Sequence, residues 1–336
     1  MTLRVAINGF GRIGRLACRA LYESGRNDIE LVAINDLAPL DTNKLLLQYD
    51  TVHRAFPYPV EIANDGLTIN GQSVKVVQER NPADLPWGDL GVDIVFECTG
   101  IFTERDNAAK HLEAGAKKVL ISAPAKGEDL TVVYGVNSDE IAADHKIVSN
   151  ASCTTNCLAP VVKSLHDAFG LDKGFMTTIH SYTGDQRIVD TMHSDLHRAR
   201  AAAMNMIPTS TGAAKAIGKV IPDLNGKLDG VSIRVPTPNV SLVDFKFMPQ
   251  KDVTVEGIND AIMTSANGNL KGILGYYDDP LVSGDFNHNP LSSIFAINET
   301  KVIDGNFVRI MSWYDNEWGF SNRMLDTAHA MHKVGY

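Results

Sequence analysis

A glycine-rich turn near the N-terminus, Gly9-Phe10-Gly11-Arg12-Ile13-Gly14, restricts the fold of this chain more than any other feature. It follows an apolar run at 5–7 and precedes an amphipathic helical pattern over 16–21, and a second apolar run at 31–34 ends at Asp36. This strand–turn–helix–strand order is the context in which G-x-G-x-x-G binds a dinucleotide. Gly9 permits the tight turn, Gly11 lets a pyrophosphate approach the backbone, and Gly14 lets helix and strand pack closely. The carboxylate of Asp36 is then placed to accept hydrogen bonds from the adenosine ribose.

Further apolar runs predict two different sheets. Those at 93–98, 118–122 and 131–134 suit a parallel sheet that continues the first two strands, and Ser122 falls at the carboxyl end of one of them. Later runs follow with few helices between them, at 174–183, 228–235, 240–247 and 307–314, and the stretch 320–333 is helical. The predicted fold class is α/β: a Rossmann-type parallel-sheet domain plus a mixed or antiparallel-sheet α+β catalytic domain.

Composition narrows the class of protein. A chain of 336 residues exceeds one ordinary core, which predicts two domains. The net charge of −9 does not indicate nucleic-acid binding, and no apolar stretch is long enough to predict a membrane span. The start of the chain does not resemble a secretory signal. The cysteines at 18, 98, 153 and 157 have neither zinc-site nor disulfide-framework spacing, so we expect no metal and a cytoplasmic location.

Cys153 is the candidate nucleophile. It stands where an apolar run at 146–148 ends and a helical pattern with one apolar face begins. The first turn of a helix offers unpaired N–H groups and the positive end of the dipole, both of which favour thiolate. A nucleophilic cysteine also needs a base, and the chain has ten histidines. His180 ends a strand and so has a rigid position, but the pattern alone leaves His166, His193 and His197 open.

Five segments together carry a family resemblance. They are 9–15 (GFGRIGR), 149–157 (SNASCTTNC), 180–186 (HSYTGDQ), 198–203 (RARAAA) and 313–317 (WYDNE). In this order they resemble phosphorylating glyceraldehyde-3-phosphate dehydrogenase, a glycolytic oxidoreductase, over the whole chain. The resemblance implies that Cys153 attacks the aldehyde to give a hemithioacetal, with His180 as general base. Oxidation then leaves a thioester, which inorganic phosphate cleaves to an acyl phosphate.

The resemblance also implies binding roles for named residues. The phosphate of the substrate, glyceraldehyde 3-phosphate, would be held by Thr183 and Arg234, with Asp185 orienting the arginine. The attacking phosphate would be held by Ser152, Thr154, Arg198, Thr211 and Gly212. The cofactor would be held by Gly9, Gly11, Arg12, Ile13, Gly14, Asp36, Arg80, Ser122 and Asn316, of which Asn316 holds the nicotinamide amide.

Domain limits and assembly follow from the same resemblance. It implies an NAD-binding domain at 1–152, with a C-terminal helix at 317–336 packing back on it, and a catalytic domain at 153–316. The stretch 181–203 resembles the family's S-shaped loop, which lies between subunits of a homotetramer. Asp36 favours NAD, because a carboxylate repels the 2′-phosphate of NADP. NADP stays open as a secondary cofactor.

Two alternative functions remain from the sequence. One is a hydrolytic erythrose-4-phosphate dehydrogenase, which shares the glycine and cysteine motifs but differs in its phosphate-binding region. Here the segments 180–185 and 209–215 follow the glyceraldehyde type. The other is an NAD-binding scaffold or regulatory protein, against which the presence of Cys153, His180, Arg234 and Asn316 argues.

Overall fold

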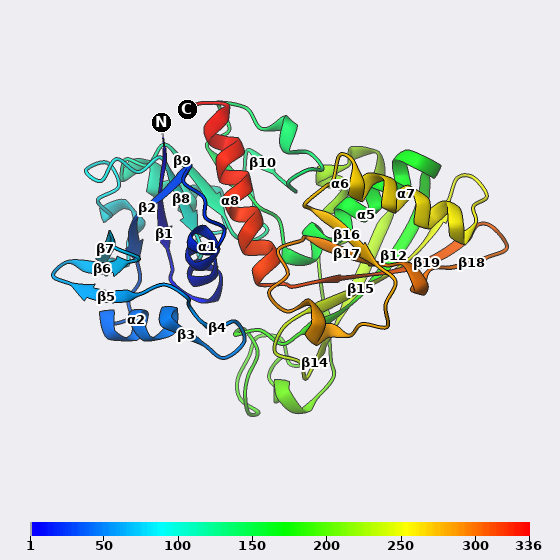
Figure 1. Cartoon of the computed structure of the whole chain (residues 1–336), viewed down its shortest axis with the longest axis horizontal. Coiled ribbons are helices and arrows are strands. Elements are labelled where there is room, and N and C mark those ends of the chain that lie inside the picture. The colour runs from blue at the N-terminus through cyan, green and yellow to red at the C-terminus, as the bar shows by residue number, and fades with distance from the viewer. Residues whose placement is uncertain (1) are drawn as a thin grey trace. The chain divides into compact units, whose positions relative to one another are not determined.

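The computed structural model describes residues 2–336 and divides the chain into two compact units (Figure 1). The first unit contains the chain up to Tyr134 together with Ser138–Ser152 and Ser321–Tyr336. The second contains Gly135–Asn137 and Cys153–Phe320. The sequence assigned residues from 317 onward to the first domain, whereas here the helix α8 (Trp318–Lys333) joins the first unit only from Ser321.

The first unit is built on a nine-stranded sheet. Its order is β10 (Leu130–Thr131), β11 (Ile147–Ser149), β9 (Lys118–Ile121), β8 (Ile94–Glu97), β1 (Leu3–Asn8), β2 (Ile29–Asn35), β7 (Gln72–Val77), β6 (Gly66–Ile69) and β5 (Val60–Ala63). Neighbours from β10 to β7 pair in parallel, and β5, β6 and β7 pair antiparallel. The predicted parallel sheet of a Rossmann-type fold is therefore confirmed, with an antiparallel extension that the apolar runs did not indicate.

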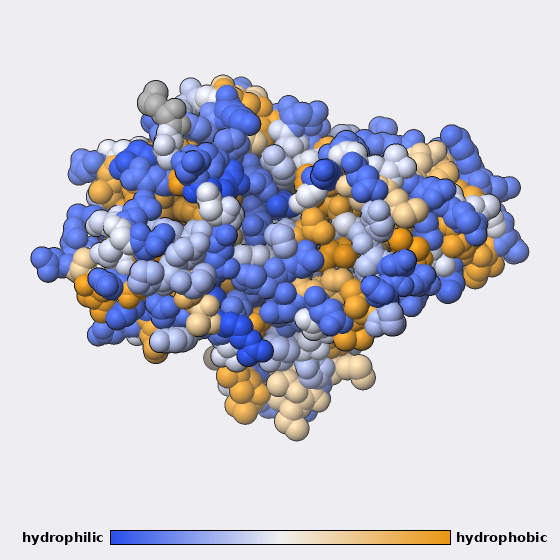
Figure 2. All heavy atoms as spheres, in the orientation of Figure 1, coloured by the Kyte–Doolittle hydropathy of each residue, from blue (hydrophilic) through white to orange (hydrophobic). Residues whose placement is uncertain are grey.

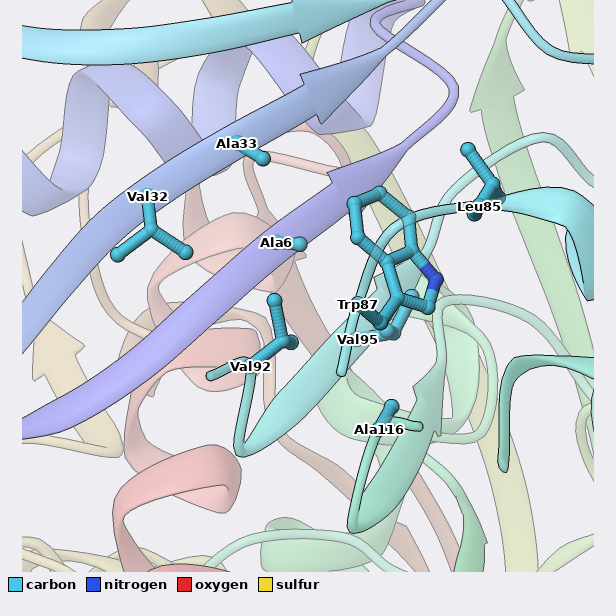
Figure 3. Close-up of a cluster of buried hydrophobic side chains, with 8 residues drawn as sticks. All are labelled: Ala6, Val32, Ala33, Leu85, Trp87, Val92, Val95 and Ala116. Carbon is cyan, nitrogen blue, oxygen red and sulfur yellow. The ribbon is translucent and has the colours of Figure 1, made fainter. Parts of the chain in front are cut away.

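Both faces of this sheet are covered. Helix α1 (Arg12–Glu23) buries Leu16, Ala17, Ala20 and Leu21, which are the apolar positions of the predicted helix. A core cluster centred on the fully buried Trp87 lies against β1, β2 and β8 (Figure 3). Its members are Ala6, Val32, Ala33, Leu85, Trp87, Val92, Val95 and Ala116. Alanines beneath the indole leave room for the large ring.

The C-terminal part of α8 is tied to this unit by polar contacts. Arg26 donates to Asp326 at 2.7 Å, and the Thr327 hydroxyl donates to the Asn150 side chain at 2.8 Å. The buried Lys118 amine donates to the carbonyl of Met331 at 3.3 Å. A lysine near the last turn of a helix satisfies carbonyls that lack a partner within the helix.

The second unit contains a mixed sheet. Its order is β13 (Ile207–Ser210), β14 (Leu228–Val235), β12 (Leu171–Ser181), β15 (Ser241–Pro249), β19 (Phe307–Tyr314), β17 (Ser293–Ala296) and β16 (Leu274–Tyr277), and β18 (Lys301–Ile303) pairs with β19. Strand β12 is parallel to β14 and antiparallel to β15, which is antiparallel to β19. Helices α5 (Cys153–Phe169) and α7 (Val255–Asn267) pack on one another and on strands of this sheet.

One edge of this sheet collects the ends of four neighbouring strands. Because of the strand directions, β12, β14 and β19 finish where β15 starts. The register pairs His180 with Arg234 on one side, and Ser241 with Tyr314 two strands away. Four strands therefore deliver polar side chains to one place.

Candidate functional site

The glycine turn of the first unit has the shape that a dinucleotide requires. Gly9 has a φ of +90°, in the region that favours glycine. A Cβ at Gly14 would lie 2.1 Å from the carbonyl oxygen of Gly9, so only glycine fits between helix and turn. A Cβ at Gly11 would meet no atom within 4 Å, which leaves the start of α1 open to a ligand. No acidic side chain occupies the first turn of α1, and no side chain caps it. The turn therefore fits a pyrophosphate on the helix N-terminus.

The carboxylate of Asp36 holds the glycine turn against the end of β2. One of its oxygens accepts from the Phe10 amide at 2.8 Å, and the other accepts from the Ala38 amide at 2.8 Å. A cavity of about 350 Å³ opens beside it. Its lining includes Gly9, Gly11, Asn35, Asp36, Leu37, Arg80 and Thr99. Its size and its position at the carboxyl ends of parallel strands suit a nucleotide.

Other predicted cofactor residues have protein partners. Arg12 forms a salt bridge with Asp50, and Ile13 follows it in the first turn of α1. Ser122 follows β9 and hydrogen-bonds the Cys98 thiol, although burial still raises the pKa of that thiol to about 12. Ser122 does not line the cavity beside Asp36.

A buried polar network supports the floor of this cavity. Glu97, at the end of β8, accepts from the Thr99 amide at 2.8 Å and from the Asn8 side chain at 2.5 Å. His111 lies 3.0 Å from the same carboxylate, and its other ring nitrogen accepts from the Trp87 indole at 3.0 Å. Since the indole can only donate, the second imidazole nitrogen must carry the proton that Glu97 accepts.

Cys153 and His180 meet in the second unit. The Cys153 Sγ lies 3.5 Å from the His180 Nε2. Cys153 is the first residue of α5, and Ala151 just before it has a φ of +56°. A left-handed residue without glycine's freedom is strained, and such strain is typical of functional sites. His180 is the penultimate residue of β12 and is 4% exposed.

The second nitrogen of His180 is also held. Its Nδ1 lies 2.7 Å from the Ser181 carbonyl oxygen and 2.9 Å from the Arg234 Nη1, which itself donates to that carbonyl at 3.1 Å. A neutral ring that donates from Nδ1 to the carbonyl presents the lone pair of Nε2 to Cys153. This is the tautomer in which imidazole can accept a proton from the thiol.

Electrostatics make the pair neutral. Burial, followed by the nearby Arg234 charge, lowers the pKa of His180 to about 3. Burial raises the pKa of Cys153, and the Arg234 charge and hydrogen bonds from Thr154 and from the backbone oppose it. The sequence predicted that the helix N-terminus favours thiolate. That contribution is present, but the desolvation of the thiol is larger.

Tyr314 links the nucleophile's helix to the base's strand. Its hydroxyl lies 2.7 Å from the Thr154 Oγ1 and 2.9 Å from the Thr178 Oγ1. Its ring packs edge-on against the His180 ring, with centroids 5.9 Å apart. No role for Tyr314 could be predicted from the sequence, because this contact depends on the pairing of distant strands.

The residues predicted to bind phosphate lie on several segments of the second unit, apart from Ser152, which belongs to the first unit. Arg198 donates to Asp185 at 2.6 Å and to the Thr209 hydroxyl at 2.9 Å. His193 is the other partner of Asp185, at 3.4 Å. The expected pairing of Asp185 with Arg234 is therefore not observed, since Arg234 reaches His180 and Ser181 instead.

The remaining phosphate candidates lie on loops, except Thr154, which is the second residue of α5. Ser152 and Thr154 flank the nucleophile, and Thr183 follows the end of β12. The Thr211 hydroxyl accepts from the Ala213 amide at 3.2 Å. A Cβ at Gly212 would meet no atom within 4 Å. Hydroxyls, free amides and arginine are the donors that phosphate oxygens require.

Asn316 follows β19 and is 5% exposed. Its Oδ1 accepts from the Ser181 hydroxyl at 2.8 Å and from the Ser241 hydroxyl at 2.8 Å. Sequence reasoning missed both serines. The one available signal was their position at strand ends, which many other polar residues share.

Three further findings concern residues 2–336. No helix there is long and apolar enough to cross a membrane. No group of three or more His, Cys, Asp or Glu residues is arranged to hold a metal ion in this part of the chain. All four cysteines are free thiols.

Comparisons with known proteins agree with this geometry. Residues 152–316 match the model of the glyceraldehyde 3-phosphate dehydrogenase C-terminal domain, and residues 3–105 match that family's NAD binding domain. The chain is 64% identical over 335 residues to a glyceraldehyde-3-phosphate dehydrogenase of Xanthobacter flavus, covering 100% of both chains. It is 63% identical over 334 residues to one from Cereibacter sphaeroides, covering 99% of this chain and 100% of the other.

Proposed function

Because this chain belongs to the glyceraldehyde 3-phosphate dehydrogenase family, whose members are NAD-dependent oxidoreductases of glycolysis, we propose that it converts glyceraldehyde 3-phosphate and inorganic phosphate to 1,3-bisphosphoglycerate. The observation that carries the proposal is the 3.5 Å contact between the Cys153 Sγ and the His180 Nε2 at the start of α5. It pairs a nucleophile with a base, which catalysis through a thioester needs.

In the first half-reaction the Cys153 sulfur attacks the aldehyde carbon as its proton passes to the His180 Nε2. The carbonyl π electrons move to oxygen, which takes the proton from the His180 Nε2, and a hemithioacetal results. His180 then removes the hydroxyl proton from the hemithioacetal. NAD would supply the hydride acceptor for this oxidation. Burial and the Arg234 charge keep the imidazole neutral before the reaction, so the lone pair of its Nε2 is available for the proton. The carbon is left as a thioester on Cys153.

In the second half-reaction a phosphate oxygen attacks the thioester carbon and the Cys153 sulfur leaves. The backbone amide of Cys153 and the His180 ring would stabilise the oxyanion in both halves. We assign the attacking phosphate to Ser152, Thr154, Arg198, Thr211 and Gly212. We assign the substrate's own phosphate to Thr183 and Arg234, and we place Asp185 at Arg198, with which it pairs.

NAD is the cofactor of this family's N-terminal domain. The glycine turn and the Asp36 carboxylate fit the pyrophosphate and the adenosine ribose respectively. For the remaining contacts we propose Arg12, Ile13, Arg80, Ser122 and Asn316, with Asn316 directed to the nicotinamide carboxamide.

Turnover with and without inorganic phosphate tests the reaction. NADH formation on glyceraldehyde 3-phosphate should require phosphate and should vanish in Cys153→Ser, because a hydroxyl is a far weaker nucleophile than a thiolate. Turnover that is indifferent to phosphate would instead indicate a thioester hydrolase of the erythrose 4-phosphate type. A wild-type protein that binds NAD but turns over neither glyceraldehyde 3-phosphate nor erythrose 4-phosphate would indicate an NAD-binding protein without this catalytic activity.

We further propose a homotetramer. The loop at 181–203 and the turn after it expose large apolar side chains, which Figure 2 shows as apolar spheres at the bottom of the view. Ile188 is 87%, Met192 is 88% and Leu196 is 82% exposed. Several large apolar side chains exposed on one loop are typical of a protein interface. A cytoplasmic location is proposed with it, supported by the four free thiols.

A further inference from the structure

Asn316 is held by two buried hydroxyls. The Ser181 and Ser241 Oγ atoms each lie 2.8 Å from the Asn316 Oδ1. Ser241 Oγ also accepts from the Ser181 amide at 3.1 Å, so its own proton is free to go to Asn316. With Oδ1 accepting from both serines, the Asn316 Nδ2 group faces the other way. Among residues 2–336 that Nδ2 group has no hydrogen-bond partner in the structure.

The residue before Ser241 has a strained backbone conformation. Val240 is 3% exposed and has a φ of +69°, a conformation that is unfavourable for a β-branched residue. The residues around it contact the segment before α8 in order: the Asn239 side-chain Nδ2 donates to the Asp315 carboxylate at 2.8 Å, and the Ser241 hydroxyl donates to Asn316. Strain that the surrounding contacts maintain is characteristic of functional sites.

Ser181 has a second connection. Its hydroxyl contacts Asn316, while its carbonyl oxygen lies 2.7 Å from the His180 Nδ1 and accepts from Arg234 at 3.1 Å. One residue at the end of β12 therefore fixes both the orientation of the base and that of the asparagine. Ser181 and Ser241 are 0% and 1% exposed, so water does not compete for these contacts.

We infer that Ser181 and Ser241 are positioning residues for NAD, which hold Asn316 with its Nδ2 hydrogens presented to the carbonyl oxygen of the nicotinamide carboxamide. The inference rests on the proposed role of Asn316. An unrestrained asparagine could rotate its amide and present an acceptor instead, which would not match a carbonyl oxygen. The two serines exclude that orientation, because an amide nitrogen turned toward them would forfeit both hydroxyl-to-oxygen bonds.

Calorimetric titration of the full-length protein with two ligands tests this. NAD carries the nicotinamide and ADP-ribose lacks it. Ser241→Ala and Ser181→Ala should each weaken NAD binding about three- to tenfold, as expected for the loss of one hydrogen bond, and leave ADP-ribose binding unchanged. Ser232→Ala is the matched control, because Ser232 is buried on the neighbouring β14 and its hydroxyl has no hydrogen-bond partner. An equal loss of affinity for both ligands, or no loss of affinity for either, would overturn the inference.

A mutant cycle separates the serines from Asn316. Asn316→Ala should weaken the binding of NAD but not that of ADP-ribose. Adding Ser241→Ala to this variant should weaken NAD binding no further. Additive effects would show that the serine acts elsewhere and would overturn the inference. If Asn316→Ala leaves NAD affinity intact, the proposed role of Asn316 itself is wrong. The analogue 3-acetylpyridine adenine dinucleotide keeps the carbonyl oxygen but lacks the amide hydrogens, so Asn316→Ala should weaken it as much as NAD. If Asn316→Ala weakens the binding of NAD but not that of the analogue, Asn316 presents its Oδ1 to the amide hydrogens of the carboxamide.

Alkylation of Cys153 without NAD provides a readout of the base. Ser181→Ala removes the hydroxyl and keeps the carbonyl that contacts His180, so the rate of reaction with iodoacetamide should match wild type. A rate reduced together with NAD affinity would indicate a general disturbance of the strand end and would overturn the specific role.

Discussion

His180 illustrates how its surroundings set the properties of a single residue. Its imidazole is buried beside a guanidinium, and both features disfavour the charged form. The same two features act oppositely on Cys153, because burial raises the pKa of the thiol while Arg234 lowers it. Proton transfer within the pair is therefore tied to events in the site, such as attack on a carbonyl.

We predict that His180 stays neutral down to about pH 4, because its pKa is lowered to about 3. Its imidazole resonance, assigned by its loss in His180→Asn, should not shift between pH 8 and pH 5. The sign for stability follows from linkage. Since the folded-state pKa lies below the unfolded value of about 6.5, His180 lowers stability as pH falls from about 6.5 toward 3. A midpoint near 6.5 for His180 would contradict this assignment.

At the scale of elements, the turn between β1 and α1 contains one glycine that is needed for packing and another that leaves space for a ligand. Gly14 packs against the Gly9 carbonyl, while Gly11 faces open space. The two glycines share a motif, but the structure gives each a different reason for being glycine.

Gly14→Ala should therefore destabilise the fold by about 1–3 kcal/mol, because its methyl group meets backbone that cannot move away cheaply. Gly11→Ala should change stability by less than about 0.5 kcal/mol. It should still weaken NAD binding at least tenfold, since the methyl group occupies the space of the pyrophosphate. Chemical denaturation and NAD titration of the two variants measure both quantities. A Gly11→Ala protein with wild-type affinity would place the pyrophosphate elsewhere.

Elements were predictable where burial leaves a clear pattern. The strands around Ala6, Val32 and Val95 are continuous apolar runs because both faces of the sheet are covered. Strand β5 is short and exposes Glu61 and Ile62, and the four-residue strand β6 has Thr68 between its buried residues, so no apolar run indicated either strand. The partners of Asp185 were not predictable either, since they depend on how the loop at 181–203 folds back on itself.

The same limit applies to the site. Cys153 and His180 were identified from their motifs, and their 3.5 Å contact required the structure. Tyr314, Ser181 and Ser241 carry no motif of their own. Their roles arise only from strand register, which places them on neighbouring strands at one edge of the sheet.

For the whole molecule, the exposed apolar side chains of the loop at 181–203 predict assembly. Leu196→Glu should lower the mass measured by light scattering from four times the 36.5 kDa chain to that of smaller species, because a carboxylate at a buried contact loses its hydration. Ile62→Glu, which changes a 44% exposed residue of β5, is the control and should leave the mass unchanged. A wild type that is monomeric at micromolar concentration would refute the tetramer.

The left-handed conformation of Val240 also bears on how this protein can be engineered. Glycine adopts such a backbone without steric penalty, so a purely stability-driven redesign would replace the valine. Yet glycine would add freedom at the start of β15 and leave a cavity where an isopropyl group is now 3% exposed. The valine favours rigidity over relief of strain, and a designer who optimises melting temperature alone would loosen the part of the sheet edge that orients Asn316.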